Sequence, residues 1–233
     1  MKKLILLAAA SVLALSACSA PVPTAPARSA SASAASPAPA ASTAAGASCA
    51  YTATGDAVKQ VDPPPATGVA NQGAADYVLT LNGEKVNLTL DQASAPCTVN
   101  SFTSLAAQGF FDGSSCHRLV DDSGLHVLQC GDPSGTGSGG PGYQFADELT
   151  GAETYPAGTL AMANAGPGTN GSQFFMVFAD SQLSPDYTVF GHVDAAGIKV
   201  LESIAKGGDD NSFGSAGGGK PNLPAVITSV QPA

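Results

Sequence analysis

Residues Met162 to Phe175 read MANAGPGTNGSQFF, in which two apolar ends enclose a loop rich in glycine and asparagine. Two further blocks precede this run, SCHRL at Ser115–Leu119 and LQCGD at Leu128–Asp132. The first of these carries Arg118, the only arginine of the chain apart from Arg28 near the N-terminus. A long run with a defined order of residue types is far more specific than a short pattern of glycines, so the interpretation of the chain begins with these three blocks.

Together the three blocks resemble the cyclophilins, and the resemblance extends from Tyr77 to Val230. It implies a mainly β fold, a closed eight-stranded antiparallel β-barrel capped by two α-helices, with peptidyl-prolyl cis/trans isomerase activity and no cofactor. Composition agrees with that fold class, because 233 residues with 27 glycines and 17 prolines are unlike a helical bundle and suit one β-rich domain. We therefore expect an enzyme that binds proline-containing peptides and unfolded proteins.

Rotation about a peptide bond has a barrier of about 18–20 kcal/mol, because resonance gives the C–N bond double-bond character. A donor aimed at the prolyl nitrogen lowers this barrier, since the nitrogen lone pair becomes available only as the bond twists. The resemblance assigns that role to Arg118, whose guanidinium is permanently charged and has several donors. The alternative for Arg118 is an ordinary surface ion pair in an acidic domain.

The same match assigns roles to three further residues. Gln129 is expected to hydrogen-bond the substrate backbone, and Asn164 to present main-chain groups to the residue before proline. Gln173 would support Arg118 or the peptide. His117 is expected to be structural and to donate a hydrogen bond to the backbone behind Arg118.

The resemblance also implies an apolar pocket for the proline ring, with several departures from the family pattern. The usual phenylalanine falls at His126, the usual methionine at Val127 and the usual histidine at Tyr187. Gln182 stands where many members carry a tryptophan that contacts cyclosporin, so we expect weak cyclosporin binding. The predicted residues of the pocket and peptide site are His126, Val127, Met162, Ala163, Asn164, Ala165, Gln173, Phe175, Leu183 and Tyr187.

Periodicity predicts the main elements. Alternating apolar residues on either side of Asn82-Gly83 predict a β-hairpin from Tyr77 to Leu90. Helical spacing predicts one helix that begins at Pro96 and ends before Gly109, and a second over Ala195–Ala205. Further strands are expected at 116–120, 126–130, 159–163, 173–178, 189–193 and 225–230.

Several glycine- and aspartate-rich loops imitate ligand-binding motifs. Gly135–Gly140 and Gly166–Gly171 match G-x-G-x-x-G, but neither lies between a strand and a helix, which excludes a dinucleotide site. Gly214–Lys220 begins like a phosphate-binding loop, yet Pro221 follows where a hydroxyl is required, so we interpret it as a flexible surface loop. Cation binding near Asp209-Asp210 is a weaker alternative to a solvated turn.

The N-terminus is typical of an exported bacterial lipoprotein. Lys2 and Lys3 precede an apolar run from Leu4 to Leu15 that is too short for a comfortable transmembrane anchor, and Leu15–Cys18 fits a lipobox. We expect a signal peptide over 1–17, then a lipidated Cys18 and a disordered Ala/Pro/Ser linker over 18–48. An N-terminal extension packed on the domain would cover 49–75, and the isomerase domain 76–233.

Charge and cysteine content agree with export. Without the two N-terminal lysines the chain has seven basic and eighteen acidic residues, which disfavours nucleic acid as a partner. Apart from Cys18 the chain has four cysteines, an even number that suits a disulfide-permissive compartment. The resemblance places Cys116 and Cys130 on neighbouring antiparallel strands, so we pair them and leave Cys49 with Cys97. Four buried free thiols remain the alternative, and the absence of a C-x-x-C pair argues against zinc or another metal.

The resulting hypothesis is a monomeric peptidyl-prolyl isomerase, lipid-anchored at the outer face of the bacterial cytoplasmic membrane or in the cell envelope. It would assist the folding of exported or cell-envelope proteins at X-Pro bonds. The competing hypothesis is a proline-segment binding or holdase module with weak catalysis, because His126 and Val127 alter the pocket.

Overall fold

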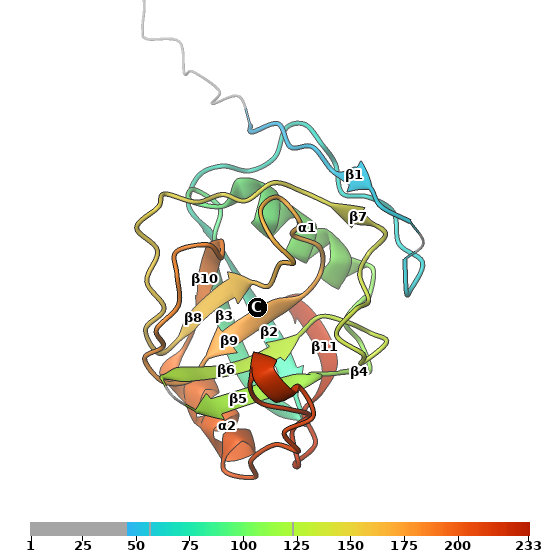
Figure 1. Ribbon diagram of the computed structural model, residues 1–233. Helices are drawn as coiled ribbons and strands as arrows, with labels where there is room; N and C mark the ends of the chain where they lie inside the picture. Colours follow the sequence, from blue (N-terminus) through green and yellow to red (C-terminus); the bar gives the residue numbers. More distant parts are fainter. Residues whose placement is uncertain (1–45, 56, 123) are drawn as a thin grey trace, which may run out of the picture. The chain divides into compact units, whose positions relative to one another are not determined.

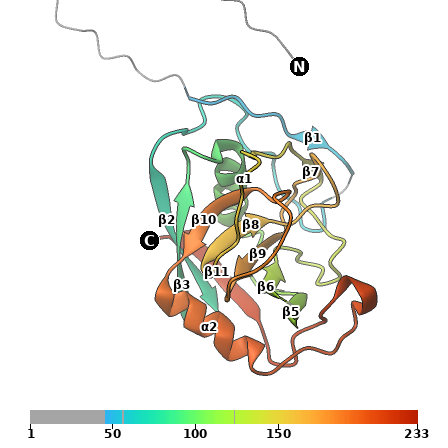
Figure 2. The ribbon, with the colours of Figure 1, turned by 60° about the vertical axis from the view of Figure 1, so that its left-hand side comes forward.

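The computed structural model describes residues 46–233 with the exception of residues 56 and 123. Nine of its strands are β2 (Ala74–Leu81), β3 (Glu84–Asp91), β4 (Ser114–Ser115), β5 (Arg118–Asp122), β6 (Leu125–Cys130), β8 (Thr159–Met162), β9 (Phe174–Val177), β10 (Val189–Val193) and β11 (Val226–Pro232). They form one antiparallel sheet in the order β4-β11-β2-β3-β10-β8-β9-β6-β5. The sheet is curled, as the two views in Figures 1 and 2 show.

The two end strands of this sheet lie next to each other in the chain. Only Cys116 and His117 separate β4 from β5. The backbone N–H of Cys116 donates to Ala225 O at 2.8 Å beside β11, and that of His117 donates to Gln129 O at 3.1 Å on β6. No ladder joins β4 to β5 within the described residues, so the predicted closed eight-stranded barrel is only approximate: the sheet has nine strands and curls without full closure.

Both predicted helices are confirmed, as α1 (Pro96–Ala107) and α2 (Ala195–Ala205). Pro96 is tolerated in the first turn of α1 because the N–H that it lacks has no partner inside a helix. Glu148, far along the chain, accepts hydrogen bonds from the N–H groups of Cys97 and Thr98 at 2.9 and 2.8 Å and so caps this helix. Asp194 caps α2 by accepting from Gly197 N at 2.7 Å.

The hairpin β2–β3 and helix α1 build much of the main core. Asn82 and Gly83 both have positive φ, 53° and 85°, as the tight two-residue turn of a hairpin requires. Apolar side chains of the hairpin point inward, among them Leu79 and Leu88, which are almost fully buried. The ring centroid of Phe102 in α1 lies 5.1 Å from that of Phe111 and 5.4 Å from those of two further core phenylalanines. This packing fixes the helix against the sheet.

The segment 46–73, which we call the N-terminal strap, lies along the domain beside α1 (Figure 1). Its strand β1 (Thr52–Ala53) pairs with β7 (Tyr143–Gln144), a two-stranded sheet that the sequence did not predict. Cys49 is joined to Cys97 of α1, and Tyr51 packs against the core.

The structure contains both expected disulfides, Cys49–Cys97 and Cys116–Cys130. The predicted signal peptide, Cys18 and nearly all of the predicted linker lie outside the described residues. Among the residues that the structure describes, no helix has the length and apolar character that crossing a membrane requires.

Candidate functional site

Arg118 lies at the start of β5, directly opposite Gln129 of β6. Because successive residues of a strand point to opposite faces, alternate positions of this hairpin share a face with Arg118. Val120, Val127 and Gln129 lie on that face, whereas Leu119 and Leu128 point into the main core. The hairpin therefore places the charged group beside apolar side chains on one surface.

The guanidinium of Arg118 is half-buried and held by oxygen acceptors. Its Nε donates to Gly217 O at 3.1 Å, one Nη donates to Gln129 Oε1 at 3.3 Å, and the other Nη donates to Ala216 O. The ring of Phe213 lies below it, with its centroid 5.7 Å from Cζ. In the described part of the chain Arg118 contacts no carboxylate, which argues against the ordinary surface ion pair.

The sequence predicts a flexible surface loop at Gly214–Lys220, and in the structure this loop packs against Arg118. Its main-chain carbonyls hold Arg118, and Gly219 bridges to Leu119 of β5. Burial lowers the pKa of Arg118 below its usual value, although nearby Tyr187 acts in the opposite direction. Neutral oxygens orient the guanidinium without cancelling its charge, which leaves that charge available to a ligand.

Two glutamine side chains extend this arrangement away from Arg118. Gln129 Nε2 donates to Gln173 Oε1 at 2.9 Å. Gln173 Nε2 in turn donates to the carbonyls of Gly137 and Gly139, both at 3.0 Å. The structure thus brings Arg118, Gln129 and Gln173 into one hydrogen-bonded chain.

A group of apolar side chains lies on the same face of the sheet, and we call it the apolar cluster. Phe175 is 5% exposed, and the ring of Tyr187 meets it edge-on at 5.6 Å. The ring centroid of Tyr155 lies 6.2 Å from those of both Phe175 and Tyr187, and the Tyr155 hydroxyl donates to Tyr187 O at 3.1 Å. The cluster consists of Val120, Val127, Tyr155, Ala161, Phe175 and Val177, with Leu125, Ala163, Leu183, Tyr187 and Val189 packed against it.

Five predicted pocket residues come together in this cluster: Val127, Ala163, Phe175, Leu183 and Tyr187. Two others do not. Met162 belongs to the main core, and its neighbour Ala161 faces the cluster instead. The prediction for Met162 is therefore wrong by one residue. Adjacent residues of a strand point to opposite faces of the sheet, so Ala161 and not Met162 lies on the face of the cluster.

His126 is also misplaced by the prediction. Its ring hydrogen-bonds Asp121 at 2.7 Å, directly opposite on the hairpin, and lies 6.0 Å from the ring of Phe178. Leu125, the preceding residue, packs against the apolar cluster. Because β6 alternates, Leu125 and not His126 contributes to the apolar cluster, and the sequence argument overlooked Leu125.

Asn164 and Ala165 lie in the loop after β8. The side chain of Asn164 donates to Asp186 O at 2.9 Å and accepts from Gly166 N at 3.2 Å. Within the described residues the main-chain N–H and C=O of Asn164 have no hydrogen-bond partner, so they are available to a bound peptide. Ala165 is exposed, and its N–H donates to Thr169 Oγ1 at 2.8 Å, so its N–H is not available in the same way.

His117 contradicts its predicted role. It is 3% exposed, and neither ring nitrogen has a hydrogen-bond partner in the described chain. Burial is the main cause that lowers its pKa; the charge of Arg118 acts in the same direction, whereas Asp132 and the side chain of Gln173 oppose it. The ring is a neutral packing group behind Arg118 and not a donor to the backbone.

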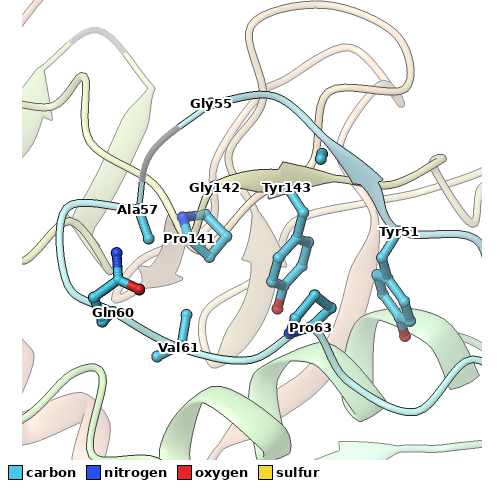
Figure 3. A pocket seen from close by; sticks show the side chains of 10 residues that line it. Tyr51, Gly55, Ala57, Gln60, Val61, Pro63, Pro141, Gly142 and Tyr143 are labelled. Atoms are coloured by element: carbon cyan, nitrogen blue, oxygen red, sulfur yellow. The ribbon is translucent and has the colours of Figure 1, made fainter.

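A cavity of about 250 Å³ lies elsewhere, between the N-terminal strap and residues 141–143 (Figure 3). Tyr51 and Tyr143 form aromatic walls, and Pro63 and Pro141 also line it. Burial raises the pKa of Tyr143 to about 12, so this phenol stays neutral. None of the predicted site residues lines this cavity, and we place the functional site at Arg118 because the charge and the hydrogen-bonded amides lie there. In the described segments no group of three His, Cys, Asp or Glu side chains could hold a metal ion.

The chain is similar to several known proteins. A family model described as "Cyclophilin type peptidyl-prolyl cis-trans isomerase/CLD" matches residues 77–231. The chain is 50% identical over 199 residues to the probable peptidyl-prolyl cis-trans isomerase B of Mycobacterium tuberculosis (strain CDC 1551 / Oshkosh), covering 79% of this chain and 64% of that protein. It is 38% identical over 182 residues to peptidyl-prolyl cis-trans isomerase A of the same strain, covering 70% of this chain and 95% of that protein. The chain thus spans less than two thirds of the first relative's length.

Solved structures are similar as well. The crystal structure of a cyclophilin type peptidyl-prolyl cis-trans isomerase from Cryptosporidium parvum matches with a TM-score of 0.60 and 28% identity, covering 69% of this chain and 98% of that one. A second crystal structure of that protein, determined in the presence of the dipeptide Ala-Pro, matches with a TM-score of 0.59 and 29% identity, covering 68% and 98%.

Proposed function

Because the chain belongs to the cyclophilin type peptidyl-prolyl cis-trans isomerases, we propose that it catalyses cis/trans isomerisation of X-Pro peptide bonds. The observation that carries the proposal is the position of Arg118, which shares one face of the β5–β6 hairpin with the apolar cluster and is held by neutral oxygens. The Ala-Pro dipeptide named with the Cryptosporidium relative supports a proline-containing substrate.

The geometry suits stabilisation of a twisted amide. The proline ring would rest on Phe175, Leu183 and Tyr187, and its binding there would exclude water. Arg118 uses three of its five N–H donors on Gly217, Ala216 and Gln129, so two are left for the prolyl nitrogen and the preceding carbonyl. A rate increase of five decades requires about 7 kcal/mol of preferential stabilisation, which a few preorganised hydrogen bonds in a dry site can supply.

One observation favours the second candidate, a proline-segment binding or holdase module with weak catalysis. The carbonyls of Ala216 and Gly217 and the ring of Phe213 already surround much of the guanidinium. A guanidinium confined in this way would bind a peptide carbonyl, but it would keep a hydrogen bond to the prolyl nitrogen less well as the amide rotates. Catalysis would then be weak.

Isomerisation of a short X-Pro peptide, measured by exchange NMR with the full chain, separates the two candidates. We expect fast exchange with the native chain and a fall of about 100-fold or more in the Arg118→Ala variant, since one directed charged donor contributes about 3 kcal/mol. Lys85→Ala, an exposed cation on β3, is the matched control and should retain full activity. Slow exchange with every variant, while the peptide still binds, would favour the binding module.

We further propose that the protein acts outside the cytoplasm on exported or cell-envelope clients as a monomer, anchored through a lipidated Cys18. Its lipobox and its two disulfides support export, because disulfides persist in oxidising compartments. Membrane fractionation of the native chain and of Cys18→Ala tests the anchor: the native chain should sediment with membranes and the variant should not.

The proposal of weak cyclosporin binding rests on Gln182. This exposed residue lies beside the β5–β6 turn, where its N–H donates to Gly124 O at 2.7 Å. A glutamine offers less apolar contact area than an indole ring, so a calorimetric titration should show weak binding.

A further inference from the structure

Asp132 is a fully buried carboxylate that the proposed mechanism does not use. One oxygen accepts from the N–H and hydroxyl of Ser134 at 2.8 and 2.6 Å. The other accepts from Gly137 N at 2.8 Å, Gly139 N at 3.0 Å and the hydroxyl of Thr136 at 3.2 Å. Five donors around one carboxylate wrap residues 134–139 about it, which explains how a buried charge is tolerated here.

Two glycines of this loop connect Asp132 to the functional site. Gly137 and Gly139 each donate an N–H to Asp132 and each accept, through their carbonyl, from Gln173 Nε2. Glycine is required at both positions. A Cβ on Gly139 would lie 2.1 Å from the Asp132 carboxylate, and Gly137 has a φ of +81° with His117 only 3.1 Å from the corresponding Cβ position.

These contacts fix the direction of every hydrogen bond up to Arg118. Main-chain carbonyls only accept, so the NH₂ group of Gln173 must face Gly137 and Gly139, and its oxygen must face Gln129. Gln129 consequently presents its NH₂ to Gln173 and its oxygen to Arg118. With the reverse orientation, an amide NH₂ would face the guanidinium and repel it.

We propose that Asp132 is a positioning residue for Arg118, acting through the carbonyls of Gly137 and Gly139 and the amides of Gln173 and Gln129. The proposal rests on the proposed isomerase function for its catalytic consequence. Its structural part, that a buried carboxylate sets the position of the guanidinium, holds independently of activity.

The test compares Asp132→Asn with Asp91→Asn in the full chain. Asp91 is a matched control, because it too accepts two N–H groups and a serine hydroxyl in a tight turn, at 2.7–3.0 Å, but shares no hydrogen bond with this network. The loss of ordering at Arg118 should lower kcat about tenfold in Asp132→Asn, the equivalent of one directed hydrogen bond, with KM changed less than about twofold. Asp91→Asn should leave both constants unchanged.

A second readout follows Arg118 directly. The chain contains only two arginines, Arg28 and Arg118, so the arginine Nε–Hε NMR spectrum has an internal reference. Asp132→Asn should shift the Arg118 resonance and leave that of Arg28 in place. If the native chain proves inactive, the proposed function fails, and this shift still decides the positioning role.

A double-mutant cycle with Gln173→Leu separates positioning from general stability. Because both residues act on one chain of hydrogen bonds, Asp132→Asn should have little further effect on kcat once Gln173 is changed. Additive losses, or an unshifted Arg118 resonance in a folded Asp132→Asn variant, would overturn the proposal. Should that variant fail to fold, Thr136→Val is the second variant, because it removes only one donor from the same carboxylate. It should shift the Arg118 resonance in the same direction by a smaller amount. An unshifted resonance in Thr136→Val would also overturn the proposal.

Discussion

Arg118 combines a permanent charge with neutral acceptors, and this combination distinguishes it from a structural arginine. Two carbonyls and one amide oxygen fix the plane of the guanidinium, and an aromatic ring lies against it. A carboxylate partner would have fixed the plane equally well but would have cancelled much of the charge that a twisted amide needs. The site thus gains orientation without losing electrostatic potential.

Arg118→Lys tests whether the planar, forked group matters beyond its charge. A lysine ammonium cannot reach the acceptors on Gly217, Ala216 and Gln129 in one geometry and still donate to a substrate. We expect kcat/KM to fall about 100-fold in the exchange NMR assay, a loss of about 3 kcal/mol of transition-state stabilisation. Activity within a few-fold of the native chain would show that charge alone suffices.

His117 gives the fold a predictable response to acid. Burial lowers its pKa, so the folded state keeps the ring neutral while the unfolded chain takes up a proton below about pH 6.5. The unfolded state then binds more protons, and the free energy of unfolding falls as pH decreases, by up to about 1.4 kcal/mol per pH unit. Urea unfolding at pH 7 and pH 5 should show a smaller acid loss in His117→Gln than in the native chain; equal losses would contradict the assignment.

At the scale of elements, long periodic segments were predictable from sequence and face assignments at short strands were not. Val99, Phe102 and Leu105 repeat at helical spacing, and Pro96 and Gly109 mark the ends of α1. In β8 and β6 a single step of alternation separates Ala161 from Met162 and Leu125 from His126. All are compatible with a strand, and only tertiary pairing decides which of them faces the site.

The sheet formed by β1 and β7 and the loop around Arg118 were harder still to predict from sequence. Strands β1 and β7 have two residues each, too few to show any period. The segment Gly214–Gly219 consists of small residues whose contribution is made by main-chain carbonyls, which leave no side-chain signature. Likewise three of the five donors that wrap residues 134–139 around Asp132 are N–H groups, which every residue type except proline carries.

The two disulfides should respond differently to reductant. Cys49 and Cys97 are partly exposed, whereas Cys116 and Cys130 are at most 2% exposed. Thiolate attack needs access to sulfur, so mild reductant should open Cys49–Cys97 first and leave Cys116–Cys130 intact in the folded protein. Alkylation of the released thiols followed by peptide mass spectrometry gives the order. Simultaneous labelling of all four cysteines would contradict it.

At the scale of the whole molecule, the N-terminal strap has two kinds of attachment: the N–H of Val58 donates to Gly140 O at 3.1 Å beside the loop around Asp132, whereas Tyr51 packs elsewhere. Tyr51 anchors the strap: its ring meets those of Tyr143 and Phe145 at 5.5 Å, and its hydroxyl donates to Cys97 O at 2.8 Å and accepts from Asn100 at 2.9 Å. None of these groups contacts Arg118 or belongs to the apolar cluster. Tyr51 should therefore influence stability and not chemistry.

Tyr51→Ala should lower the free energy of unfolding by about 2–3 kcal/mol, somewhat less than for a fully buried aromatic, with kcat/KM unchanged. Tyr51→Phe retains the ring and should lose only about 1 kcal/mol, the contribution of the hydroxyl. Denaturant unfolding and the exchange NMR assay on the same samples measure the two quantities. A matching loss of activity in the folded alanine variant would show that strap and site are coupled.

The bond between Cys49 and Cys97 also determines how the domain bears mechanical tension. A force applied to the chain N-terminal to Cys49 is transmitted through the disulfide to Cys97 in α1. The residues between the two cysteines, including the β2–β3 hairpin, lie in a closed covalent loop and are not stretched. At about 3.6 Å per residue, the 48-residue separation shortens the extensible length by about 170 Å while the bridge is intact. Reduction of the disulfide would restore this extensible length, and the applied force would then act on the β2–β3 hairpin.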